Sequence, residues 1–357
     1  MISEIMIDES DKWDKIVNTF EKYDVYYLSG YAKSLQFHGD GEPILFYYEG
    51  DGIRAINVVM KRDISKAPHF SGKLEEGAYF DIATPYGYGG FLIEGEVGED
   101  SLKRFDEEYS FYCKDRGIVS EFVRFHPVLN NSAGLEEIYQ VREAGKTVSI
   151  HLDSQEQITE ALSGNTRREI KKSTESGVEV FWGRSPWLYQ EFITLYTATM
   201  DRRNAKSYYY FEKEFFDALL NDLKYNAMLF YSVYEGRIIA MALVLMANQK
   251  MHYHLAAGNI DYQKFSPMAL MIYEAACWGC ENGFDTFHMG GGLGGSEDSL
   301  FRFKKGFNRN EANVFSLGSK IFDEAKYAQL AAMRKTEDGI DNTGDFFPVY
   351  RAVPGTA

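Results

Sequence analysis

The feature that most constrains the fold is a pattern that occurs twice. Residues 44–61 read ILFYYEGDGIRAINVVMK, and residues 228–246 read MLFYSVYEGRIIAMALVLM. In each stretch, two runs rich in β-branched and aromatic residues flank a turn that contains glycine, which predicts an antiparallel hairpin. A Gly-bearing loop, a helical segment and a further strand follow each hairpin. The repeat therefore predicts an α/β chain of two similar units in tandem, each with a mixed sheet.

The chain length agrees with this duplication, because 357 residues exceed what one ordinary core holds. We expect an N-terminal domain over 1–148, a C-terminal domain over 149–340 and a tail over 341–357. A strand over 146–152 is expected to cross between the halves. A doubly wound dinucleotide fold is not expected, because no GxGxxG follows a first strand.

The first half is expected to contain a helix near 9–22 and two strands within 42–62 around a Gly-Asp-Gly turn. Apolar residues at three- and four-residue spacing predict a helix over 98–116, which Gly117 ends. The first half is also expected to contain a strand that runs into a Tyr/Gly/Pro loop within 78–95, and a strand over 118–127. In the second half we expect helices over 155–163, 167–176, 185–203, 212–223 and 267–283 and strands over 178–183, 227–258 (three antiparallel) and 285–291.

The charge of the chain limits its partners. Thirty-eight basic and 53 acidic residues leave a net charge of −15, which argues against binding DNA or an anionic membrane through the overall field. A phosphate-bearing partner would need a local basic surface. The basic residues do cluster in the second half: Arg167, Arg168, Lys171 and Lys172; Arg202, Arg203 and Lys206; Arg302, Lys304, Lys305 and Arg309.

A cytoplasmic location is expected. The acidic N-terminus lacks an apolar signal region, no window of about 18 uninterrupted apolar residues predicts a membrane span, and three cysteines cannot form a disulfide framework. Cys277 and Cys280 have redox-motif spacing, but they come late in a helical segment rather than at its start. We interpret them as small core residues, and no metal site is expected.

Four stretches of the second half carry a family resemblance: 163–180, 196–220, 253–292 and 287–307. In their order and spacing they resemble the FemABX-type aminoacyl- and peptidyltransferases and their BioF2-like relatives, and TPYGYGG at 84–90 resembles the first-domain loop of the latter. The resemblance implies two tandem GNAT-like (acyl-CoA N-acyltransferase-like) domains. The family adds amino acids to cell-wall precursors from aminoacyl-tRNA, and relatives use other acyl donors.

The resemblance also implies residue roles. Lys304 matches a lysine implicated in acyl transfer, which would stabilise the oxyanion formed when an amine attacks a carbonyl. Asp81 lies near the position of an acidic residue that handles the amine proton. Arg203, with Arg202 as the alternative register, matches an arginine that holds an anionic substrate.

Further binding residues are expected around these positions. Glycines such as Gly291 and Gly292 would let the backbone pass close to a substrate, and a helix that starts at Asp298 and Ser299 would present Phe303 and Lys304. Candidate substrate contacts also include Tyr86, Tyr88 and His254. His254 alternates with His252 on one strand, so both would point to one face as cleft or core side chains.

The acyl donor is open at this point. Lys264 and the helix start at Ser266 and Pro267 are candidate donor contacts, because free N–H groups there bind anions. Residues 263–269 read QKFSPMA, whereas a typical acetyl-CoA turn is Q/R-x-x-G-x-G/A. His288 stands where the family often has Asp, and no long helical hairpin is inserted for tRNA.

Three hypotheses follow. The first is a FemABX-like N-acyltransferase that acts on a primary amine of a small molecule, cell-wall precursor or sugar nucleotide, with aminoacyl-tRNA or acyl-CoA as co-substrate and no tightly bound cofactor. The second is a GNAT enzyme dependent on acetyl- or acyl-CoA. The third is a duplicated fold that binds a glycan or nucleotide-sugar without chemistry.

Overall fold

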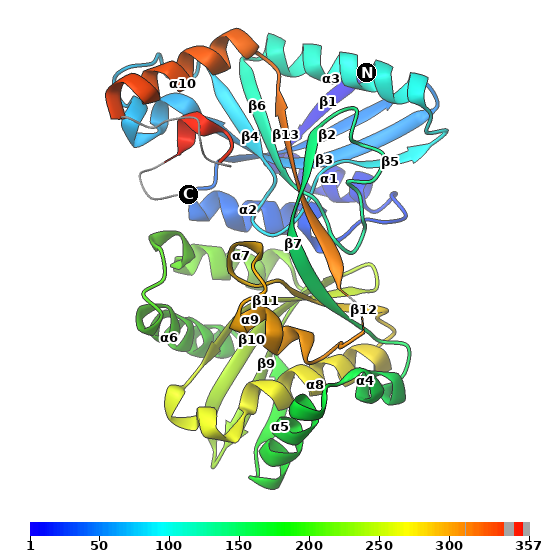
Figure 1. Ribbon diagram of the computed structural model, residues 1–357, viewed down its shortest axis with the longest axis vertical. Coiled ribbons are helices and arrows are strands. Elements are labelled where there is room, and N and C mark those ends of the chain that lie inside the picture. The colour runs from blue at the N-terminus through cyan, green and yellow to red at the C-terminus, as the bar shows by residue number, and fades with distance from the viewer. Residues whose placement is uncertain (311, 339–345, 353–357) are drawn as a thin grey trace. The chain divides into compact units, whose positions relative to one another are not determined.

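The chain forms two compact α/β units. The computed structural model describes residues 1–310, 312–338 and 346–352. Unit 1 comprises Met1–Lys22, Tyr26–Glu143 and the described residues of Ser316–Ala357, and unit 2 comprises Tyr23–Val25 and the described residues of Ala144–Phe315 (Figure 1). Residues 316–338 thus belong to unit 1, whereas the expected boundary at 340 groups them with the second half. The reason is that the strand and helix of this segment pair with and pack on unit 1.

Unit 1 contains a mixed sheet with the strand order β1-β2-β3-β4-β6-β13, and β5 pairs with β3. Its strands are β1 (Ile2–Met6), β2 (Glu42–Gly50), β3 (Ile53–Asp63), β4 (Phe80–Ala83), β5 (Leu92–Gly95), β6 (Ile118–Arg124) and β13 (Asn313–Ile321). Its helices are α1 (Ser10–Val17), α2 (Ser29–His38), α3 (Glu99–Asp115) and α10 (Glu324–Asp338).

Aromatic side chains fill the main core of unit 1. Phe105 and Tyr109, one helical turn apart on α3, pack edge-on against Phe91, and Tyr109 also contacts Phe46 of β2. A second cluster joins Ile64, Phe70 and Val119 to Leu330 of α10 and to Tyr350. The C-terminal segment therefore supplies part of the core of unit 1.

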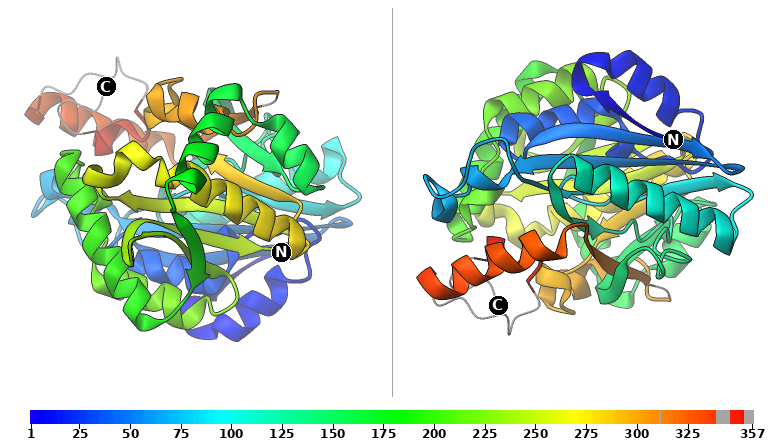
Figure 2. Two further views of the ribbon diagram at one scale, coloured as in Figure 1. Left: turned by 90° about the horizontal axis from the view of Figure 1, so that it is seen from below. Right: turned by 90° about the horizontal axis from the view of Figure 1, so that it is seen from above.

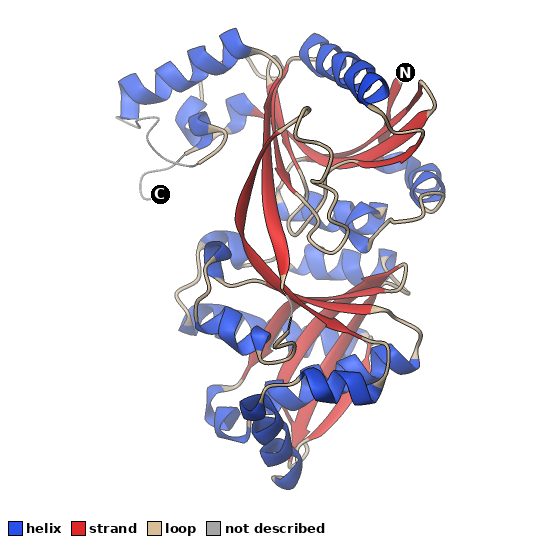
Figure 3. Ribbon diagram, turned by 45° about the vertical axis from the view of Figure 1, so that its right-hand side comes forward, coloured by secondary structure: helices blue, strands red, loops and turns tan. Residues whose placement is uncertain are grey.

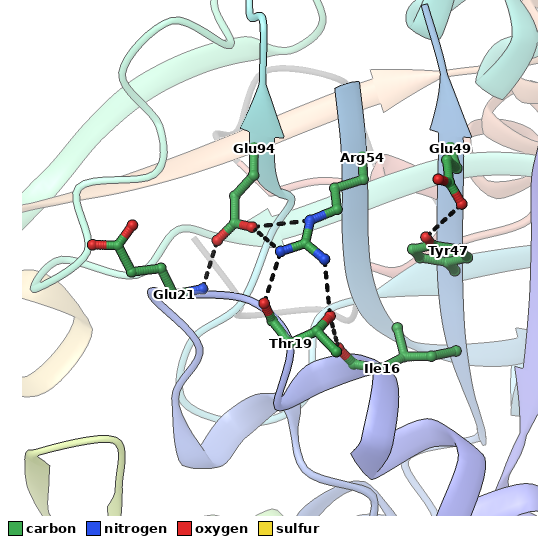
Figure 4. Close-up of polar contacts among 7 residues, drawn as sticks. All are labelled: Ile16, Thr19, Glu21, Tyr47, Glu49, Arg54 and Glu94. Atoms are coloured by element: carbon green, nitrogen blue, oxygen red, sulfur yellow. Dashed lines mark hydrogen bonds and ion pairs between the residues drawn. The ribbon is translucent and has the colours of Figure 1, made fainter. Parts of the chain in front are cut away.

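A polar cluster ties the segment after α1 to the sheet of unit 1 (Figure 4). Arg54 of β3 donates to Glu94 Oε2 through Nη2 (2.6 Å) and Nε (3.1 Å), and to the Thr19 carbonyl oxygen (2.7 Å). The other Glu94 oxygen accepts from the backbone N–H of Glu21 at 2.6 Å. One guanidinium thus satisfies groups from β5 and from the loop, which anchors that loop on the edge of the sheet.

Unit 2 contains a mixed sheet with the strand order β7-β12-β11-β10-β9-β8. Figure 3 shows the strands of the chain in red and the helices in blue. Its strands are β7 (Gln140–His151), β8 (Glu179–Gly183), β9 (Ala227–Tyr234), β10 (Arg237–Ala247), β11 (Lys250–Gly258) and β12 (Thr286–Gly290). Its helices are α4 (Gln155–Ala161), α5 (Gly164–Glu175), α6 (Pro186–Arg202), α7 (Lys213–Asp222), α8 (Pro267–Glu281) and α9 (Ser299–Lys305).

Helices cover both faces of the sheet in unit 2 (Figure 2). The α8 face holds an apolar core that includes Val244, Met251, Met271 and Phe287. The α6 and α7 side has its own aromatic stack, in which Phe192 contacts Tyr196 and Phe216. The sheet is therefore buried on both faces, in agreement with the apolar runs of its central strands.

The predicted repeat is visible in the strand pairing. Antiparallel β2–β3 in unit 1 corresponds to antiparallel β9–β10 in unit 2. Each unit then has one parallel pair, β4–β6 or β11–β12, whose connection contains the helix α3 or α8. Parallel neighbours require such a crossover, so the sequence pattern had already implied this topology.

Some elements differ from the expectation. The first helix covers 10–17 rather than 9–22, and β7 begins at Gln140 rather than 146. β1, α2, β13 and α10 were not expected. Of the C-terminal tail expected over 341–357, residues 341–345 and 353–357 lie outside the described residues. Among the described helices, none is long and apolar enough to span a bilayer.

Candidate active site

Lys304 lies in the last turn of α9, and its amine is buried. Asp298 starts this helix by accepting a hydrogen bond from the backbone N–H of Phe301 at 2.9 Å, which confirms the predicted helix start. The Lys304 side chain donates from Nζ to the Gly291 carbonyl oxygen at 2.7 Å, and the residue is only 8% exposed. Burial lowers the pKa of Lys304 to about 8, although the negative charge of Asp298 opposes this effect.

The glycine run connects β12 to α9 along a crowded path. A Cβ at Gly292 would lie 2.1 Å from the Ser296 carbonyl oxygen and 2.4 Å from Asp298 Oδ1. A Cβ at Gly291 would lie 2.7 Å from the Lys146 carbonyl oxygen of β7. Asp298 also accepts from the Leu293 N–H at 3.2 Å. The glycines are thus required by the close approach of the chain's own backbone, and this approach places the Gly291 carbonyl in front of Lys304.

The parallel strands β11 and β12 pair over a short stretch. Only Lys250–His252 and Thr286–His288 are in register, while β11 continues from Tyr253 to Gly258 without further partners in β12. The two strands therefore part after His288, two residues before β12 ends. The glycine run follows soon after this point, and the Lys304 amine is bonded to the carbonyl of Gly291, directly after the end of β12.

The C-terminal end of α6 is attached to the far end of β11. The Gly258 N–H donates to Thr199 Oγ1 at 3.3 Å, and the Gly258 carbonyl accepts from Arg202 Nη2 at 3.1 Å. Arg202 is therefore engaged with the backbone of the strand. The next residue, Arg203, is exposed, and its charge opposes the rise that burial causes in the pKa of Tyr253.

Tyr253 is a candidate site residue that the sequence reasoning missed. Its hydroxyl donates to Met268 Sδ in the first turn of α8 at 3.1 Å. It thereby connects β11 to the start of α8. The charge of Arg203, at the end of α6, lowers the pKa of its hydroxyl against the effect of burial. Tyrosines are numerous in this chain, so no local signal distinguishes Tyr253, although its position on the strand before the helix could have suggested it.

The start of α8 is where the sequence places it, but it is built differently. Ser266 occupies the N-cap position before Pro267, and its backbone is left-handed with φ 54° and ψ 43°. Its side chain makes no capping hydrogen bond, because this conformation turns it away from the first turn. Lys264 is exposed, with Nζ 5.0 Å from the centre of the Phe265 ring.

Two histidines alternate on β11, as expected. His252 Nε2 lies 2.9 and 3.0 Å from the two carboxylate oxygens of Asp24, and the His252 ring contacts that of His288 at 5.5 Å. Burial lowers the pKa of His254 to about 3, helped by neighbouring His252, so His254 is neutral at physiological pH. The position that differs from the family, His288, is therefore part of a buried polar cluster.

Two of the three basic clusters can be placed relative to each other. The Gly306 carbonyl accepts from the Ser163 N–H at 2.8 Å, and the Arg309 N–H donates to the Ala161 carbonyl at 3.2 Å. These bonds join the segment after α9 to the start of α5. The exposed Arg167, Arg168, Lys171 and Lys172 of α5 are therefore in the same part of unit 2 as the cluster around Lys304.

The remaining predicted residues are placed as follows. Phe303 is half-buried, with its ring 5.5 Å from that of Phe307. Asp81, Tyr86 and Tyr88 belong to unit 1. The fully buried Asp81 carboxylate accepts from Arg62 Nε at 2.7 Å and from Arg351 Nε. The carboxylate is held between two guanidinium groups, and its two oxygens fix the positions of both arginines.

Tyr86 and Tyr88 lie in the expected loop. Burial raises the pKa of Tyr88, whose ring packs edge-on against that of Tyr26 at 5.6 Å. Gly87 between them has φ 99°, and a Cβ there would lie 2.5 Å from the Tyr26 ring. The loop is thus held in one conformation by a glycine and an aromatic neighbour.

Comparison with protein families identifies the part of the chain that carries these features. Residues 162–305 match the model of the acetyltransferase (GNAT) domain family. Residues 162–305 of this chain are therefore similar to GNAT domains. The match begins just before α5 and ends at the last residue of α9, so it includes Lys304, Tyr253 and the parted strands. The predicted enzyme class is confirmed: the chain is an acyltransferase.

Solved structures extend the likeness to the whole chain. A crystal structure of FemX has a TM-score of 0.64 and 15% identity, and the alignment covers 92% of this chain and 99% of FemX. A conserved protein of unknown function from Bacteroides thetaiotaomicron has a TM-score of 0.56 and 12% identity, with 89% and 99% covered. A comparison with curated proteins finds no match.

A third structure belongs to a protein assigned as a lysylphosphatidylglycerol synthetase from Agrobacterium fabrum. Its C-terminal domain (DUF2156) has a TM-score of 0.55 and 14% identity, with 92% of this chain and 96% of that chain covered. Identities this low show the fold. Together with the repeated pairing of the two units, they confirm the predicted fold class of mixed α/β sheets in two tandem GNAT-like units.

Proposed function

We propose that this GNAT protein is a FemABX-like N-acyltransferase, which transfers an aminoacyl or acyl group to a primary amine. The observation that supports this most directly is the buried Lys304 amine, held 2.7 Å from the Gly291 carbonyl beside the parted strands. The acceptor in this proposal is a small molecule, a cell-wall precursor or a sugar nucleotide. A cytoplasmic location, where activated acyl donors are made, is part of the proposal.

The proposed reaction is addition followed by elimination. The acceptor nitrogen attacks the acyl carbonyl carbon, and the carbonyl oxygen becomes an oxyanion. Lys304 as ammonium stabilises this charge, because a preorganised cation in a site with little water acts strongly on it. The tetrahedral intermediate then expels the oxygen or sulfur of the donor, and the amine proton passes to water or to a carboxylate.

The donor in this proposal is phosphate-bearing. Basic side chains on α5 and after α9 lie in one part of unit 2, in a chain whose net charge is −15. Both aminoacyl-tRNA and acyl-CoA carry phosphates that such a surface would attract. We favour aminoacyl-tRNA, because the residues before α8 lack the glycines of a typical acetyl-CoA turn. Acyl-CoA is the second candidate, supported by the GNAT domain itself.

The other predicted residues keep their proposed roles. Arg203 is proposed to hold an anionic substrate, with Arg202 already bound to Gly258. His254, Gly291, Gly292 and Phe303 are proposed substrate contacts in unit 2, and Tyr86 and Tyr88 in unit 1. Lys264 and Ser266 are proposed donor contacts. The family match argues against the third hypothesis, a binding protein without chemistry.

The test compares two adjacent lysines. Lys304→Ala removes the buried amine, whereas Lys305→Ala removes a lysine whose Nζ donates to the Asn308 carbonyl at 2.8 Å. Purified protein is incubated with lysyl- or alanyl-tRNA, or with acetyl-CoA, and with a panel of amine acceptors, and N-acylated product is measured by mass spectrometry. Lys304→Ala is expected to reduce turnover about 10²- to 10³-fold, and Lys305→Ala less than about threefold.

Circular dichroism and thermal unfolding show whether both variants remain folded. Wild-type turnover in a folded Lys304→Ala protein would remove Lys304 from the mechanism. Turnover with acetyl-CoA and none with either aminoacyl-tRNA would replace the favoured donor by the second candidate.

A further inference from the structure

Unit 1 contains a cavity that the proposed reaction does not use. Its volume is about 930 Å³, and all of its lining residues belong to unit 1. They come from the end of α2, the adjoining ends of β2 and β3, the turn after β3 and the C-terminal segment. A cavity of this size accommodates a small organic molecule with one or two phosphate groups.

Basic side chains dominate the wall of this cavity. Lys61, Arg62, Lys66, Arg334 and Arg351 line it, against two acidic residues, Glu42 and Asp63. Asp63 is engaged with its own loop: one carboxylate oxygen accepts from the Ser65 N–H and hydroxyl, and the other from the Gly77 N–H. In a chain with a net charge of −15, this local excess of positive charge needs an explanation.

Two of the arginines are held in place from behind. The buried Asp81 carboxylate accepts from the Nε atoms of Arg62 and Arg351, so each guanidinium keeps its terminal nitrogens for other partners. Arg351 Nη2 is buried and makes no hydrogen bond within the part of the chain that the structure describes. Arg334, also buried, donates to the Ala352 carbonyl. The cations are thus preorganised, which lowers the entropy lost when an anion binds.

The charge and shape of the wall select the ligand class. A single carboxylate needs one arginine. Here five cations face the carboxylates of Glu42 and Asp63 and the Asp81 carboxylate behind the arginines, which leaves an excess of two positive charges and matches a ligand with more than one negative charge. Guanidinium groups bind phosphate oxygens in pairs, and lysines act on phosphates as point charges. We propose that this cavity, the unit 1 basic cavity, is a binding site for a small phosphorylated molecule of the diphosphate class.

The experiment uses the full chain and inorganic pyrophosphate as the probe. Isothermal titration calorimetry at low ionic strength is expected to show one site per chain with submillimolar affinity. The variant Lys61→Gln/Lys66→Gln removes two cations of the cavity wall without touching the Asp81 pairs. It is expected to weaken pyrophosphate binding at least fivefold.

A matched control removes the same charge elsewhere in unit 1. Lys15→Gln/Lys103→Gln changes two exposed lysines that do not line the cavity, and its affinity should stay within about twofold of the wild type. Arg351→Lys keeps a cation beside Asp81 but removes the planar guanidinium group, which binds phosphate oxygens in pairs. It is expected to weaken binding severalfold, which provides a second test if the double variant is unstable.

The outcomes are decisive in both directions. Absence of binding at 10 mM pyrophosphate, or equal losses in the cavity variant and its control, would overturn the proposal. Citrate, which carries three carboxylates, is titrated in parallel. If citrate binds as tightly as pyrophosphate and shows the same loss in the cavity variant, the site is a general polyanion site and the phosphate class is wrong. Unchanged pyrophosphate binding by Lys304→Ala is expected, because that residue belongs to unit 2.

Discussion

At the scale of single residues, the chemistry depends on how a charged group is buried. Lys304 is almost fully enclosed, yet its Nζ has one backbone carbonyl as a partner at 2.7 Å. Burial disfavours the charged form, which brings its pKa to about 8 from the value near 10.4 of an exposed lysine. A group with this pKa changes its charge in a range that enzyme assays reach.

The pH dependence of turnover is therefore a test of the charge state that Lys304 needs. As an oxyanion stabiliser it must be protonated, so log kcat is expected to fall above about pH 8, where Lys304 loses its proton. The measurement is kcat from pH 6 to 10 for the wild type and Lys304→Arg. The guanidinium stays protonated over this range, so the variant should lose the high-pH fall even if its kcat is lower.

Lys305→Arg provides the control, because it changes a neighbouring lysine outside the proposed chemistry and should keep the fall. Turnover that continues to rise through pH 9 in the wild type would contradict the role of Lys304 as a protonated oxyanion stabiliser. His254 is expected to cause no change in turnover with pH above pH 5, since its pKa of about 3 keeps it neutral there.

At the scale of elements, the site depends on the connection between strand β12 and the short helix α9. The connection from β12 to α9 runs between the β7 backbone and the Asp298 carboxylate, and only glycine fits at its tightest points. Asp298 serves both ends, because it accepts from Leu293 in the loop and from Phe301 in the helix. The same carboxylate therefore holds the loop and caps the helix, and both together position Lys304.

Gly292→Ala is expected to disturb this element. The added methyl would meet the Ser296 carbonyl and Asp298, so the loop must shift and the cap weakens, which lowers the free energy of unfolding by about 1–2 kcal/mol. Displacement of Lys304 should reduce turnover about tenfold or more. Urea unfolding and turnover of the purified variant provide the two numbers.

Gly164→Ala is the matched control. Gly164 starts α5, and no atom lies within 4 Å of the methyl group that alanine would add there, so the change should be neutral or stabilise by about 0.5–1 kcal/mol. A Gly292→Ala protein with wild-type stability and turnover would show that the loop is not constrained as described.

At the scale of the whole molecule, each unit is built from segments that are not continuous in the sequence. Unit 1 takes its last strand and helix from the end of the chain: residues Leu317–Ile321 of β13 pair with Ser120–Arg124 of β6. Phe322, Leu330 and Tyr350 complete its apolar clusters. Unit 1 therefore cannot complete its core until the chain has passed through unit 2.

A chain that ends at Phe315 is expected to lose the fold of unit 1. Three buried side chains at about 2 kcal/mol each amount to roughly 6 kcal/mol, which is comparable to the total stability of many domains. Circular dichroism should show a loss of structure, and limited proteolysis with mass spectrometry should locate the cleavages in residues 1–143.

A chain that ends at Ala352 retains these side chains and should match the full chain in both measurements. If the chain that ends at Phe315 unfolds at the same temperature as the full chain and resists protease equally, the C-terminal segment is not part of the core of unit 1.

Local patterns were sufficient for several features of this protein. The repeated hairpin, the helix start at Asp298 and the helix start at Pro267 depend on neighbours in sequence, through turn chemistry, capping and side-chain periodicity. Lys304 was predicted from the family resemblance of one continuous stretch, residues 287–307. The sequence by itself thus determined the α/β duplication, the acyltransferase class and the position of the candidate lysine.

Only the tertiary structure decided which distant groups meet. Asp81 and Arg351 are 270 residues apart, yet they share a hydrogen bond in unit 1. Neither the Gly291 carbonyl that holds Lys304 nor the Tyr253 contact with Met268 has a local signal. Burial, and with it the lowered pKa of Lys304, depends on the packing of all these segments, because desolvation is a property of a surrounding volume and not of a neighbouring residue.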